Sequence, residues 1–165
     1  MRVPLLVLFA CPGLLAAPLE RGTPLFSLRM EGLVGQPTTR LSARAGGALG
    51  VAVRLTDQLA AIGDVGTRAA PRGPLTTIAL GLSATIDATP VAPFVELSVV
   101  QIGPRGTAAY SLATRTAFGA DWSFARGLAI GLVVRQFLAF DPVVDGDAPG
   151  GTEAAIRFVY TPGGK

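Results

Sequence analysis

The sequence contains no histidine, one cysteine and few charged residues. Histidine is the side chain that most often transfers protons near neutral pH, so its absence excludes a Ser-His-Asp or His-Ser active site. The single cysteine, Cys11, cannot form a disulfide within the chain. A metal site would need oxygen ligands, and we interpret Asp141, Asp145 and Asp147 as an acidic loop rather than a calcium site. We therefore expect no enzyme activity, cofactor or bound metal.

Only 15% of the residues are charged, whereas 50% are hydrophobic and the mean hydropathy is +0.50. Soluble domains carry about 25% charged residues. The apolar residues nevertheless form no run of the roughly 20 that a membrane-spanning helix requires. The basic residues are dispersed and not interleaved with aromatic residues, so we expect no binding to nucleic acid. The apolar surplus must therefore face something other than water without transmembrane helices.

Residues 1–17 have the order of a secretory signal peptide. Arg2 provides a basic start, residues 3–10 are largely apolar, and residues 11–17 are rich in Pro, Gly and Ala. We expect cleavage near Ala16 and a single β-barrel domain over residues 18–165. An alternative is that residues 8–11 resemble a lipoprotein box, in which case Cys11 would be acylated after export.

From residue 25 onward, alternating polar and apolar residues indicate eight strands. Charged residues fall on one parity of nearly every segment, and aliphatic or aromatic residues fall on the other. The predicted strands span residues 25–34, 44–55, 59–68, 75–86, 91–102, 110–122, 128–140 and 153–160. The charged parity contains Arg29, Glu31, Arg44, Arg54, Asp64, Glu96, Arg115, Asp121, Arg135, Glu153 and Arg157.

The connections between these segments alternate in length. Residues 55–58, 87–90 and 123–127 form tight turns, whereas residues 35–40, 69–74, 103–109 and 141–151 form mostly longer connections rich in Gly and Pro. This alternation is typical of outer-membrane barrels, in which short turns face the periplasm and longer loops face outward. With an even number of strands, both termini are expected in the periplasm.

Lipid offers no hydrogen-bond partner to a free strand edge, so a sheet in a membrane must close on itself. The sequence therefore predicts an all-β fold, an eight-stranded antiparallel up-and-down transmembrane β-barrel. Eight strands enclose a space that side chains can fill. We expect the inward charges to neutralise one another there, because an unpaired buried ion costs several kcal/mol. A narrow polar pathway is the alternative.

Residues 25–160 resemble the small outer-membrane β-barrel proteins, such as the transmembrane domain of outer membrane protein A. The alternation of Ile156, Phe158 and Tyr160 resembles the C-terminal signal that the barrel-assembly machinery recognises, although residues 161–165 continue beyond it. Trp122 is expected at a membrane interface. The resemblance implies an outer-membrane protein in contact with lipid.

We expect a non-enzymatic structural or surface-interaction role, with the extracellular ligand unknown. A narrow, porin-like channel or small-molecule transport barrel is the first alternative. A soluble lipocalin-like ligand-binding barrel is the second, but the first strand lacks the Gly-x-Trp that lipocalins normally carry.

Overall fold

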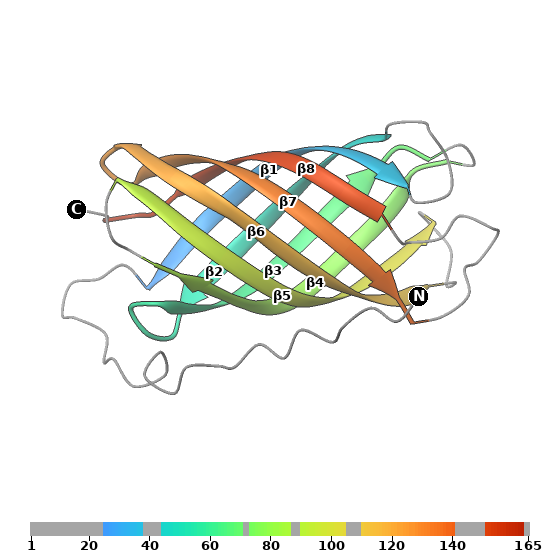
Figure 1. Ribbon diagram of the computed structural model, residues 1–165, viewed down its shortest axis with the longest axis horizontal. Coiled ribbons are helices and arrows are strands. Elements are labelled where there is room, and N and C mark those ends of the chain that lie inside the picture. The colour runs from blue at the N-terminus through green and yellow to red at the C-terminus, as the bar shows by residue number, and fades with distance from the viewer. Residues whose placement is uncertain are drawn as a thin grey trace, which may run out of the picture.

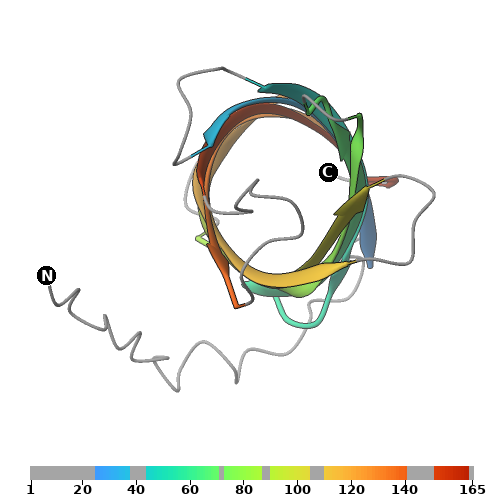
Figure 2. The same ribbon diagram turned by 90° about the vertical axis from the view of Figure 1, so that its right-hand side faces the viewer.

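A computed structural model describes residues 25–37, 44–70, 73–86, 90–104, 110–140 and 151–163. They form eight strands, each antiparallel to its neighbours. The first strand pairs with both the second and the last, so the sheet closes into a barrel, and the predicted fold class is confirmed (Figures 1 and 2). The strands are β1 (Phe26–Pro37), β2 (Arg44–Arg54), β3 (Leu59–Arg68), β4 (Leu75–Thr85), β5 (Val91–Pro104), β6 (Ser111–Ala125), β7 (Leu128–Ala139) and β8 (Gly151–Tyr160).

The predicted segments match these strands to within three residues at each end. β1 and β6 both run three residues beyond their predicted ends, into segments that were expected to be connections. Residues 123–127 were expected to form a turn, but β6 continues to Ala125 and the turn is Arg126–Gly127 alone. Trp122, Ser123 and Phe124 continue the alternation, so the strand has no reason to stop before them. Gly127 has a φ of +69°, in the left-handed region that favours glycine.

The strands are staggered by ten residues around the barrel. A path through paired residues leaves β1 at Phe26 and returns to it at Gln36. It passes through Val53, Ala61, Leu82, Leu97, Thr116, Gln136 and Thr152. With about 3.3 Å per residue and about 4.8 Å between strands, this stagger tilts the strands by about 40°. The tilt is visible in Figure 1.

The two faces of the sheet differ sharply in exposure. Leu80 and Leu132 point outward and are each 70% exposed, whereas their chain neighbours Ala79 and Val133 point inward and are each 1% exposed. The outward residues are apolar along most of every strand. Toward the end that carries the longer connections the outward residues are mixed. Leu112 and Leu138 are apolar, and uncharged polar residues occur among them at Thr67, Thr76, Gln101, Thr114, Gln136 and Thr152.

The two ends of the barrel also differ. Residues 55–58, 86–90 and 126–127 join strands at the end where β1 begins and β8 ends, which we call the short-turn end. The connections at the opposite, long-loop end lie mostly outside the described residues. Within the described ranges, no helix is long and apolar enough to cross a membrane. The signal-peptide prediction for residues 1–17, Cys11, and the loop aspartates Asp141, Asp145 and Asp147 also lie outside the described residues.

Candidate functional site

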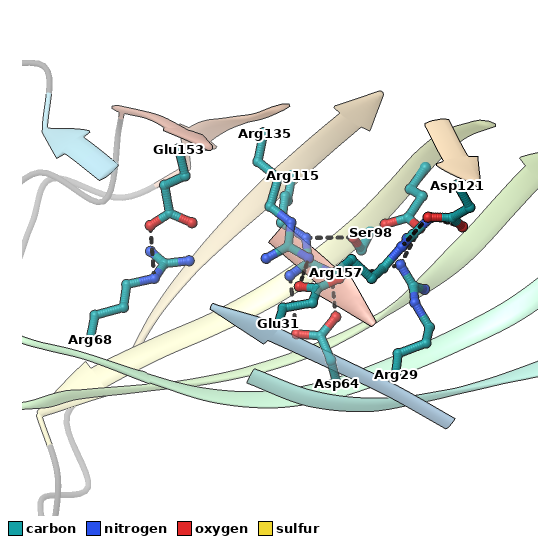
Figure 3. Close-up of polar contacts among 11 residues, drawn as sticks. Arg29, Glu31, Asp64, Arg68, Ser98, Arg115, Asp121, Arg135, Glu153 and Arg157 are labelled. Carbon is teal, nitrogen blue, oxygen red and sulfur yellow. Dashed lines mark hydrogen bonds and ion pairs between the residues drawn. The ribbon is translucent and has the colours of Figure 1, made fainter. Parts of the chain in front are cut away.

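The lumen holds a network of ion pairs contributed by six of the eight strands (Figure 3). Every arginine in the network lies within 4.0 Å of a carboxylate, and the charges balance. The network comprises five arginines and five acids, namely Arg29, Arg68, Arg115, Arg135 and Arg157 with Glu31, Asp64, Glu96, Asp121 and Glu153.

Glu96 is the centre of the part of this network nearest the short-turn end. Its Oε1 accepts hydrogen bonds from Arg29 and from Nη1 of Arg157, the latter at 2.7 Å. Arg157 also donates two hydrogen bonds to Asp121, at 3.0 and 2.5 Å, and its guanidinium lies 3.7 Å from the centroid of the Phe94 ring. Arg157 is thus held by two acids and one aromatic face.

Phe94 needs space that a glycine provides. A Cβ on Gly119 would overlap the Phe94 ring and the carbonyl oxygen of Leu132. The glycine on β6 therefore leaves room for the ring that contacts Arg157. The sequence analysis did not identify Phe94, because an aromatic residue among inward charges gives no distinct pattern.

The middle of the lumen contains two further pairs. Arg115 donates to both carboxylate oxygens of Asp64, at 3.0 and 2.5 Å, and its Nε donates to Ser98 at 3.1 Å. Arg135 donates to Glu31. The side chains of Arg115 and Arg135 are each 1% exposed, so these guanidinium groups are withdrawn from water.

Near the long-loop end the interior also contains apolar side chains, which the sequence analysis did not predict. A buried cluster forms there from Ala79, Val100, Ile102, Ala113 and Phe137. Arg68 lies beside this cluster, with its guanidinium 4.3 Å from the Phe137 ring centroid and Nε 2.9 Å from Glu153.

The structure brings together most of the charged residues that the sequence singled out, with two exceptions. Arg54 faces the lumen at the short-turn end but has no ion pair among the described residues, so its predicted membership of the network is wrong. Arg44 begins β2, and its side chain lies outside the described part of the chain. Arg68, which the sequence analysis did not name, is a further member through its ion pair with Glu153.

A cavity of about 210 Å³ occupies the lumen at the short-turn end. Its lining includes the turn residues Thr56, Asp57 and Gln58, together with Arg54, and it extends inward to Glu96. The part of the chain that the structure describes contains no group of three or more His, Cys, Asp or Glu residues arranged to hold a metal ion.

The remaining predicted residues lie on the outer surface. Ile156, Phe158 and Tyr160 point outward from β8 and are between 45% and 50% exposed. Trp122 also points outward near the short-turn end, with its ring centroid 6.3 Å from that of Phe124. Phe124 was missed because its segment was taken for a turn.

A buried, charge-balanced lumen inside a closed ring with an apolar exterior is a combination shared with solved structures. The chain has the fold of the eight-stranded transmembrane barrels. The N-terminal β-barrel domain of Pseudomonas aeruginosa OprF matches with a TM-score of 0.59 and 12% identity, over 81% of this chain and 96% of that one. Neisserial surface protein A (NspA) matches with a TM-score of 0.60 and 11% identity, over 85% and 99%.

A designed transmembrane β-barrel also matches this barrel, with a TM-score of 0.58 and 15% identity, over 87% of this chain and 98% of that one. No protein-family model and no curated protein matches the sequence. At these identities the likeness establishes the fold, and the function must be argued from the barrel's own residues.

Proposed function

We propose that this protein is an integral outer-membrane barrel with a closed lumen, and that it has a non-enzymatic structural or surface-interaction role. The observation that carries the proposal is the contrast between a lipid-compatible exterior and an interior filled by neutralised charge. OprF and NspA, which share the fold, support the outer membrane as the location.

The height of the apolar exterior supports a membrane location. On β5 the outward residues are apolar from Val91 to Val99, and Gln101 follows. At about 3.3 Å per residue and a tilt of about 40°, this stretch rises about 20 Å, close to the apolar band of about 25 Å on outer-membrane barrels. A soluble lipocalin-like barrel would expose this band to water at a large cost.

The filled lumen favours a closed barrel over a channel. An ion crossing it would have to separate the Arg115–Asp64 and Arg135–Glu31 pairs. It would then have to pass the Arg68–Glu153 pair and the apolar cluster around Phe137. Separating a buried ion pair is strongly unfavourable. In planar bilayers we expect no reproducible unitary steps from the purified protein, with a porin reconstituted in parallel as the positive control. Regular steps would favour the channel alternative instead.

The two ends of the barrel differ in the length of their connections. This difference supports termini in the periplasm and longer loops outside the cell, as in outer-membrane barrels generally. Ala69→Cys at the long-loop end should react with a membrane-impermeant maleimide on intact cells. Arg126→Cys at the short-turn end should react only after the outer membrane is permeabilised. The parent chain controls for labelling of Cys11, and the reverse pattern would overturn the proposed orientation.

A further inference from the structure

The cavity at the short-turn end contains polar groups that the ion-pair network does not use. Its volume of about 210 Å³ corresponds to about seven water molecules at bulk density. Four alanines, Ala52, Ala60, Ala92 and Ala129, form part of the wall and leave this space open. The cavity can therefore hold a small molecule without displacing the wall.

Arg54 is the charged group that most clearly lacks a counterpart. The five network arginines each lie within 4.0 Å of a carboxylate, whereas Arg54 has no such partner among the residues that the structure describes. A guanidinium group offers five N–H donors arranged to bind a carboxylate through two hydrogen bonds. Arg54 is thus suited to an anionic group that enters the cavity.

Hydroxyl groups surround the same space. Ser27, Ser83, Thr85 and Ser123 line the cavity, and their hydroxyls have no hydrogen-bond partner within the described ranges. The hydroxyl oxygen of Thr56 accepts hydrogen bonds from the backbone N–H groups of the residues two and three positions later. Its hydrogen remains free to be donated. These side chains add neutral donors around the charge of Arg54.

Asp57 provides an acceptor at the rim of the cavity. Glu96 lies at the inner end of the lining, but its side chain is 1% exposed and its oxygens are withdrawn from the open space. Asp57 is therefore the carboxylate that a ligand in the cavity can reach.

We propose that the cavity binds a small carboxylate that also carries a hydrogen-bond donor, which is the chemistry of the smaller amino acids and hydroxy acids. The ligand's carboxylate pairs with Arg54, and its donor is directed to Asp57. The cavity opens at the short-turn end, so the ligand enters from that side.

The test uses the full chain, purified in detergent micelles, with ¹³C-labelled alanine methyl groups. Glycine and glycolate are the probes, and acetate is the carboxylate without a donor. We expect saturable shifts of the cavity methyls of Ala52, Ala60, Ala92 and Ala129 with both probes, and weaker binding of acetate. Ala79 and Ala113 in the apolar cluster should not respond.

Arg54→Gln should weaken binding of both probes at least about 10-fold, as expected for loss of a charge-assisted hydrogen bond. Arg126→Gln removes a cation from the same end but outside the cavity lining, and should leave binding unchanged. Ala129→Leu fills the space and should weaken binding with Arg54 in place, so it tests the site even if Arg54→Gln fails to fold. Heat-modifiable gel migration checks folding.

Three results would overturn the proposal. They are absence of saturable shifts at probe concentrations up to about 100 mM, equal binding by Arg54→Gln and the parent chain, and acetate binding as tight as that of the other two. Glycine binding without glycolate binding, or the reverse, supports the proposal and identifies which donor Asp57 prefers.

Discussion

Removing the charge of Asp64 should destabilise the barrel strongly, because Arg115 has no other carboxylate partner among the described residues. The Arg115 side chain is 1% exposed and the Asp64 side chain is 11% exposed. Asp64→Asn preserves the shape of the side chain but leaves a buried guanidinium with neutral partners only, the new amide oxygen and Ser98. Breaking a buried pair from one side costs about 3–5 kcal/mol, and we expect Asp64→Asn to fall in this range.

The assay is equilibrium unfolding by guanidinium chloride in lipid vesicles, followed by the fluorescence of the single tryptophan, Trp122. Arg115→Met combined with Asp64→Leu removes both charges and fills similar volumes. We expect this double variant to lie within about 1–2 kcal/mol of the parent chain, because a paired buried charge gains little over apolar packing. Arg126→Gln, on the exposed turn, should change stability by less than about 0.5 kcal/mol.

The difference between the single and double variants is the decisive quantity. If Asp64→Asn costs less than about 1 kcal/mol, water must solvate Arg115 in the lumen. The interior would then be a hydrated pathway rather than a filled one. That result would also remove the main support for a closed barrel.

Three further predictions concern the wall, the lipid face and assembly. Gly119→Ala should cost about 1–3 kcal/mol through overlap with Phe94, whereas Gly32→Ala, with no atom within 4 Å of the new Cβ, should be neutral or stabilising in the same unfolding assay. Leu132→Arg, midway along the apolar exterior of β7, should lower the free energy of unfolding in vesicles by about 2–4 kcal/mol. Leu128→Arg, at the edge of that exterior, should lower it by about 0–1 kcal/mol. Equal costs would argue against a membrane location. Tyr160→Ser should slow insertion by the reconstituted assembly machinery, measured by heat-modifiable migration over time, while Tyr110→Ser at the opposite end should not.

The sequence was sufficient to predict the fold because inward-facing and outward-facing residues alternate along each strand and differ in charge and polarity. Arg115 lies between the outward-facing Thr114 and Thr116, and Glu96 between Val95 and Leu97, so the parity of each strand is clear. Closure of the sheet into a barrel was predicted because the backbone N–H and C=O groups of an open strand edge have no hydrogen-bond partner in lipid. The eight strands and their antiparallel order therefore required no knowledge of tertiary contacts.

The partners within the lumen could not be predicted in the same way. Asp64 and Arg115 lie on β3 and β6, which are not adjacent, and they meet only because the ten-residue stagger brings their levels together. The stagger depends on every register in the ring. Arg54 illustrates the consequence. Its inward orientation was predicted correctly, but its position near the short-turn end places it in the cavity rather than beside a carboxylate of the network.

Charged residues in the lumen help to specify the register of the strands, in addition to any effect on stability. Apolar filling would be at least as stable as ion pairs, but a strand apolar on both faces could slip by one residue at little cost. With charges inside, such a slip would place residues such as Arg115 or Arg157 in lipid, at about 2–4 kcal/mol for each arginine.

Near the long-loop end, inward and outward residues also differ in polarity. There some inward residues are apolar and some outward residues are polar. Val100 and Phe137 point into the apolar cluster, and their neighbours Gln101 and Gln136 point outward. A one-residue slip at this level would bury an amide and expose an aromatic ring, so it is again penalised. At Gln101 and Gln136 the two faces therefore still differ in polarity, so the register of β5 and β7 remains specified beyond the charged part of the lumen.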